Sequence, residues 1–98
     1  MFNIEIDKKN IMKAITVLAI EKTLCGIGEP VFDKVAKKLQ KEHDCYIPDC
    51  YDHPEYLDKV LRSIFGNSYL TIVKSIKEEL MENIDDVGIR TLVKTIGG

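Results

Sequence analysis

Residues 26–30 read Gly26-Ile27-Gly28-Glu29-Pro30 and form the sharpest break in the helical pattern of this 98-residue chain. Glycine enters the left-handed backbone conformation without strain, so Gly26 suits the position that directly follows a helix. Proline suits the first turn of a helix, because the backbone N–H that it lacks has no helical partner there. The stretch therefore predicts a tight turn between a first helix over residues 8–25 and a second over residues 30–42.

The first of these helices carries a stripe of apolar residues at alternating steps of three and four, which is the spacing of one helix face. We expect this stripe to be the face that the helix turns to the core, with Met12, Ala19 and Leu24 on its flanks. A lysine is its one polar member, and the stripe consists of Ile11, Ile15, Leu18, Lys22 and Cys25.

The second half of the chain repeats the arrangement of two helices around a glycine. Pro54 suits the start of a helix that Gly66 ends, and Ser68 is placed to cap the next helix. The sequence thus predicts an all-α fold of one domain, a compact bundle of four to five helices. It consists of a short extended arm (1–7), a first helical hairpin (8–42), a linker loop (43–53), a second helical hairpin (54–83) and a C-terminal helix with its tail (84–98).

The N-terminal arm alternates Phe2, Ile4 and Ile6 with polar residues, which is the period of a short strand. A lone strand has no partner elsewhere in the chain. We expect the arm to pack its apolar residues onto the helices, and a strand shared with a second copy is the alternative. A homodimer through this arm or through the last helix is therefore an expectation.

Composition excludes several classes of function. The chain has 14 Lys and Arg against 16 Asp and Glu, so its net charge of −2 offers no overall attraction to nucleic acid or anionic lipid. Its start has neither the basic nor the apolar region of a secretory signal, and its longest apolar run is too short to span a bilayer. An odd count of three cysteines rules out a complete disulfide framework within one chain. These features predict a cytoplasmic protein with reduced thiols and no membrane partner.

Residues 43–54 concentrate the reactive side chains, including both histidines and two of the three cysteines. We interpret the stretch mainly as a linker that Ile47 and either Tyr46 or Tyr51 anchor to the core. Zinc prefers four thiolate or imidazole ligands, so a zinc or other soft-metal site is one alternative. A disulfide between the two cysteines or a hydrolytic Cys-His pair are the others. The candidate ligands are Cys45, Cys50, His53 and His43, of which Cys50 and His53 form the best pair, Cys45 comes next and His43 fits least.

The second predicted helix carries four lysines along one face, opposite its apolar residues. Such a stripe is typical of a solvated surface, and lysines near the end of a helix also suit its dipole. The alternative is a contact for an acidic partner or weak binding of nucleic acid. Nucleic acid is the less favoured partner, because no recognition helix rich in Arg, Asn or Gln accompanies the stripe to read bases. These candidate interaction residues are Lys34, Lys37, Lys38 and Lys41.

Several short pieces of the chain occur in the order seen in a family of small archaeal helical modules. They are Gly28-Glu29-Pro30, Leu39, Ile47-Pro48, Pro54-Glu55, Ile64-Phe65-Gly66 and Glu79-Leu80. Over about residues 11–81 the chain resembles this family, the Nitrosopumilus output domain. The resemblance implies an all-helical module that acts alone or fused to signalling proteins as an output or interaction domain. The segment between Pro48 and Pro54 is longer here than in the family pattern.

The resemblance implies no catalytic residue and no cofactor, and the sequence itself has no oxyanion-hole signature beside its cysteines and histidines. We therefore predict a non-enzymatic protein-interaction or output module in archaeal signalling or regulation. The alternatives are a metal- or redox-responsive helical module that uses residues 43–53, or a weak nucleic-acid binder that uses the lysine stripe.

Overall fold

The computed structural model describes residues 7–98, so the predicted N-terminal arm lies outside the described residues except for Asp7. Five α-helices and three short 3-10 helices make up the described part, which contains no strand and confirms the all-α prediction. The α-helices are α1 (Lys8–Ile27), α2 (Glu29–His43), α3 (Pro54–Phe65), α4 (Tyr69–Leu80) and α5 (Val87–Thr95), and the 3-10 helices are η1 (Ile47–Tyr51), η2 (Gly66–Ser68) and η3 (Met81–Asn83).

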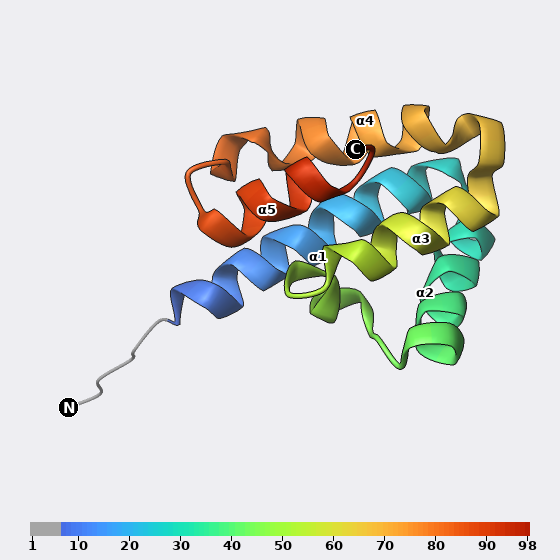
Figure 1. The fold of residues 1–98 in the computed structure, drawn as a ribbon, viewed down its shortest axis with the longest axis horizontal. Helices are drawn as coiled ribbons and strands as arrows, with labels where there is room; N and C mark the ends of the chain where they lie inside the picture. Colours follow the sequence, from blue (N-terminus) through green and yellow to red (C-terminus); the bar gives the residue numbers. More distant parts are fainter. Residues whose placement is uncertain (1–6) are drawn as a thin grey trace.

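Helix α1 is the longest element and runs through the middle of the molecule (Figure 1). It packs against α2, α4 and η1, while α3 packs against α2, α4 and α5. Large aliphatic side chains that are fully buried come from all five helices. The bundle therefore has one continuous core, and one side of helix α1 faces this core. Fully buried members outside α1 include Val35, Leu39, Leu57, Leu61, Ile76, Leu80, Ile89, Leu92 and Ile96.

The turn between α1 and α2 comes two residues later than predicted. Gly26 lies within α1, and the residue between the two helices is Gly28. The backbone N–H of Gly28 donates to the carbonyl of Leu24 at 3.1 Å, so the helical hydrogen bonds continue past Gly26. The prediction of a left-handed Gly26 was therefore wrong. Gly66 at the end of α3 does have a positive φ of 51°, a backbone conformation that favours glycine.

The side of α1 that faces the core also differs from the prediction. Thr16, Ile20 and Leu24 are completely buried, whereas Leu18 of the predicted stripe is 62% exposed and Ile11 is 41% exposed. The helix is thus rotated by about one residue from the predicted orientation.

Thr16 explains this difference. Its hydroxyl donates to the backbone carbonyl of Met12 at 2.9 Å, within the same helix. A buried hydroxyl that keeps a hydrogen bond avoids most of the cost of leaving water. Thr16 therefore occupies a core position, although the predicted apolar stripe placed neighbouring residues such as Ile15 in the core. The displaced apolar residues remain at the surface.

Candidate functional site

The segment between α2 and α3 has a structure of its own and packs against α1 through η1. Pro48 occupies its first turn, and the carboxylate of Asp49 accepts a hydrogen bond from the backbone N–H of Tyr46 at 3.1 Å. Ile47 is 8% exposed and Tyr51 is half-buried, whereas Tyr46 is 57% exposed. The predicted linker thus contains a 3-10 helix, which Ile47 and Tyr51 anchor to the core.

Both cysteines of this segment point inward. Cys45 is 2% exposed and Cys50 is fully buried. Their thiols donate to the same acceptor, the backbone carbonyl of Tyr46, at 3.4 and 3.9 Å. Burial raises the pKa of the Cys45 thiol and raises that of Cys50 far above its ordinary value. At neutral pH both groups are therefore neutral thiols rather than the thiolates that act as nucleophiles.

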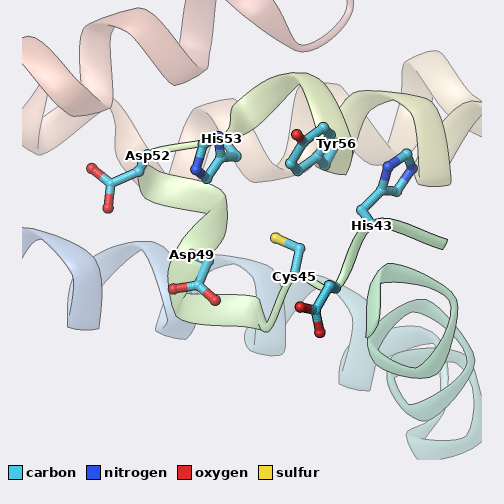
Figure 2. Close-up of a pocket in the computed structure, with 7 residues that line it drawn as sticks. His43, Cys45, Asp49, Asp52, His53 and Tyr56 are labelled. Atoms are coloured by element: carbon cyan, nitrogen blue, oxygen red, sulfur yellow. The ribbon is translucent and has the colours of Figure 1, made fainter. Parts of the chain in front are cut away.

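The two histidines lie on opposite sides of an aromatic ring. The ring of Tyr56 on α3 stacks with His43 at a centroid distance of 4.6 Å and with His53 at 5.1 Å (Figure 2). The Nδ1 atom of His53 also lies 3.4 Å from the carboxylate of Glu55. A shared metal site would require both imidazoles to bind the same ion, but the ring of Tyr56 lies between them.

The four predicted metal ligands are therefore not gathered around a common centre. Within residues 7–98, no group of three or more His, Cys, Asp or Glu side chains is placed to hold a metal ion. The thiols share a carbonyl below the surface, and no hydrogen bond in this part of the chain joins a thiol to an imidazole. The zinc site and the hydrolytic Cys-His pair stay predictions without a matching arrangement of side chains.

A polar hollow of about 290 Å³ opens over this segment (Figure 2). Its acidic rim is partly neutralised, because Asp52 pairs with Lys9 at 3.2 Å and with Lys13 at 3.1 Å. The hydrogen bond from Lys13 is the largest influence on the pKa of Asp52 and lowers it. The segment is thereby tied to the first half of α1. The hollow is lined by His43, Asp44, Cys45, Asp49, Asp52, His53 and Tyr56.

A contact that the sequence analysis missed fixes the other end of η1. The hydroxyl of Tyr51 donates to the carboxylate of Asp86 at 2.6 Å, and the same carboxylate accepts from the backbone N–H of Ile89 at 3.0 Å. Asp86 thus caps α5 and holds the loop together with it. A Cβ atom added to Gly88 would overlap the Tyr51 ring, so glycine at this position permits the close approach. A glycine inside the first turn of a helix was the available signal.

The lysine stripe lies on the exposed side of α2, as predicted. Lys34, Lys37 and Lys41 are exposed, while Lys38 lies 2.5 Å from the carboxylate of Glu42. This hydrogen bond is the main reason that the pKa of Glu42 is lowered. The pairing removes one of the four positive charges from the candidate surface.

The apolar residues that α1 turns away from the core form a second candidate surface, here called the α1 outer face. Leu18 lies at its centre, and a hollow of about 580 Å³ runs along one side of Leu18 towards Pro48. The lining of this hollow is mainly apolar, with Asn10 and Lys13 as its polar members. The α1 outer face consists of Ile11, Ala14, Ile15, Val17, Leu18 and Cys25, all of them exposed or half-buried.

The end of the outer face nearest α2 is acidic. A hollow of about 280 Å³ surrounds the exposed Cys25, with Phe32 as its aromatic member and three carboxylates around it. Partial burial and these carboxylates raise the pKa of the Cys25 thiol. No ion pair engages the three carboxylates within residues 7–98. They are Glu21, Glu29 and Asp33.

Among the helices of residues 7–98, none combines the length and the apolar character needed to cross a bilayer. Comparisons with models of protein families, with curated proteins and with solved structures give no match. The resemblance to the Nitrosopumilus output domain therefore stays a prediction. A proposal about function has to rest on the geometry of the chain itself.

Proposed function

We propose that the chain is a non-enzymatic protein-interaction or output module, and that it binds its protein partner through the α1 outer face. One observation carries this proposal: Leu18 is 62% exposed at the centre of a helix face that also presents Ile11, Ala14 and Cys25. A role in archaeal signalling or regulation follows from the sequence resemblance, and a cytoplasmic location follows from the composition. Both belong to the same proposal.

The α1 outer face leaves apolar side chains in contact with water. Burying their apolar area stabilises a complex by about 25 cal/mol per Å², and contiguous exposed patches on soluble domains commonly mark binding surfaces. Leu18 adjoins a hollow of about 580 Å³, so a partner side chain has a place to enter beside it. Other exposed apolar residues, such as Leu70 on α4 and Val87 on α5, are outside this face.

The side chains of residues 43–54 make structural contacts, which supports the proposal. The thiols of Cys45 and Cys50 are buried and neutral, and Tyr51 holds the segment to the start of α5. These contacts stabilise the fold. The segment contributes Pro48 to the edge of the hollow beside α1, so its reactive residues serve mainly to position that edge.

A metal- or redox-responsive module remains the second candidate, because the two buried thiols share one acceptor carbonyl. Elemental analysis of protein purified without added metal tests it, together with thermal melting in the presence of a chelator. Bound metal at one equivalent and a lower Tm in chelator would favour this candidate. Substoichiometric metal and an unchanged Tm would remove the metal version.

A photo-crosslinking experiment tests the proposed interaction. A photoreactive phenylalanine analogue replaces Leu18 in one variant and Leu70, which is 65% exposed, in a matched control. Irradiation in cells of the native host should give a discrete crosslinked protein with the probe at position 18 and little with the probe at position 70. Equal crosslinking from both positions, or none from position 18, would contradict the proposal.

A further inference from the structure

We propose that the occupant of the α1 outer face is a second copy of this chain, with the two α1 helices antiparallel and a twofold axis close to Leu18. This inference rests on the proposed function, because it names the partner of the same face. It differs from the sequence expectation, which placed a homodimer at the N-terminal arm or the last helix.

The exposed residues of the α1 outer face are regularly spaced along the helix. Ile11, Leu18 and Cys25 follow one another at intervals of seven, and Ala14 lies between the first two. Side chains seven apart lie almost on one line along a helix, which is the arrangement that two helices use to pack lengthwise. Ala14 is small, so the backbones can approach closely beside it. The line lies opposite Ile20 and Leu24, which bind α1 into its own core.

The surface around Leu18 also has a shape that suits a second copy. This side chain lies between two hollows and lines both of them. One of about 580 Å³ extends towards Pro48, and the other, of about 320 Å³, extends towards Glu79 on α4. A ridge with a hollow on each side is self-complementary, because a twofold axis sets each ridge beside a hollow of the other copy.

The charged side chains beside the α1 outer face decide the direction of the second copy. Near its start, Lys13 lines the hollow beside Leu18 and is paired with Asp52 of the neighbouring segment. Near its end, three carboxylates gather around Cys25, namely Glu21, Glu29 and Asp33. An antiparallel pair therefore sets Lys13 of each copy on the side of the acidic end of the other.

A parallel pair is disfavoured by the same charges. It would place the two acidic hollows side by side, and like charges across an interface oppose association. Lys13 and Glu21 lie about 12 Å apart along the helix axis, on either side of Val17. In the antiparallel pair, the partner's Glu21 is therefore brought towards Lys13. The partner's Cys25 is brought close to Ile11.

Directed disulfide formation in the purified chain tests both the face and the direction. The variant Ile11→Cys, with the native Cys25 retained, is treated with diamide as the oxidant. We expect a covalent dimer, because residue 11 of one copy faces residue 25 of the other. The wild-type chain should give little dimer, since its two Cys25 thiols lie at opposite ends of the interface. The double variant Ile11→Cys, Cys25→Ser should likewise give little dimer.

A second variant, Leu18→Cys in a Cys25→Ser background, keeps the test decisive if the first folds poorly. Residue 18 lies close to the axis, so this variant should dimerise with itself, whereas Leu70→Cys in the same background should not. Wild-type dimers linked through Cys25 would overturn the antiparallel direction. Absence of dimers from both position 11 and position 18 would overturn the second copy as occupant.

The outcomes for this inference and for the proposed function are distinguishable. A purified chain that forms no covalent dimer, together with a photoprobe at position 18 that captures a different protein, would overturn only the second copy. A probe that captures nothing, together with no dimer, would overturn both.

Discussion

Residues 43–54 and helix α1 differ in which kinds of side chain they expose to solvent. The segment holds both histidines and two of the three cysteines, yet its thiols are buried and its imidazoles are stacked on Tyr56. The outer face of α1 is mainly apolar, yet Leu18 and Ile11 remain exposed. In residues 43–54 both thiols are thus buried and each imidazole packs one face against Tyr56, whereas the outer face of α1 leaves apolar side chains in water.

The largest effect that we expect is a difference in reactivity between the thiols of residues 43–54 and the thiol of Cys25 on α1. At pH 8, Cys25 should react with a thiol reagent in the native chain. Cys45 and Cys50 should react only when local unfolding exposes them. We expect their labelling to be slower by a factor of about 100, which corresponds to an opening free energy of about 3 kcal/mol.

Mass spectrometry of partially labelled protein measures this ratio. A Cys25→Ser variant should show no fast thiol, and denaturant should make all three native thiols react at similar rates. Three fast thiols in native buffer would mean that residues 43–54 are open to solvent, and the comparison would then fail.

The next effect concerns the contact that holds the segment to α5. In Gly88→Ala, the added methyl group overlaps the Tyr51 ring, and the ring has to move away from Asp86. We expect a loss of about 1–3 kcal/mol in the free energy of unfolding, as for other overpacked sites. Denaturant titration followed by circular dichroism measures this free energy.

Gly26→Ala is the matched control, because Gly26 lies inside α1 with no atom near its missing Cβ. It should stabilise the chain by about 0.5–1 kcal/mol, since alanine favours helix interiors over glycine. A destabilised Gly26→Ala variant would restore the predicted left-handed turn at this residue. A neutral Gly88→Ala variant would remove the close approach between Tyr51 and α5.

A smaller effect is the dependence of stability on pH through Asp86. Burial alone would raise the pKa of this carboxyl, but hydrogen bonds from Tyr51 and from the backbone of Ile89 hold it below its ordinary value. A carboxyl with a lowered pKa in the folded state stabilises the fold above its unfolded pKa of about 4, and this stabilisation is lost as pH falls through the folded value.

The variant Asp86→Asn isolates this contribution. At pH 7 we expect it to be about 0.3–1 kcal/mol less stable than the wild type, because the negative charge at the start of α5 is lost, and the difference should shrink towards zero as the pH falls through the lowered pKa of Asp86. Denaturant titrations at several pH values give the two curves. Parallel curves over the whole range would show that the charge of Asp86 has no part in holding the segment.

Local signals in the sequence predicted most of the fold. Pro30, Pro54 and Gly66 mark helix boundaries through the backbone conformations open to them, so the helix positions agree closely with the structure. The orientation of α1 was not predictable in this way, because two apolar stripes compete on it. The buried one includes Thr16, whose internal hydrogen bond is invisible in a hydrophobic pattern.

The candidate site was predicted less well, and the reason is the range of the contacts. The sequence placed cysteines and histidines in one short segment, but the direction of each side chain depends on what packs beneath it. Tyr56 enters from α3 and separates the imidazoles, and Tyr51 bonds to Asp86, 35 residues further along the chain. Composition and spacing contain no information on such pairings.

Sedimentation equilibrium of three chains tests the central claim, that the α1 outer face binds a second copy. The chains are the wild type, Leu18→Glu and Leu70→Glu, in which the two replaced leucines are 62% and 65% exposed. We expect the wild type and Leu70→Glu to associate into dimers with similar affinity, while Leu18→Glu stays monomeric and keeps its helical circular dichroism. A wild type that stays monomeric at millimolar concentration, or a Leu18→Glu chain that associates as strongly as Leu70→Glu, would contradict the claim.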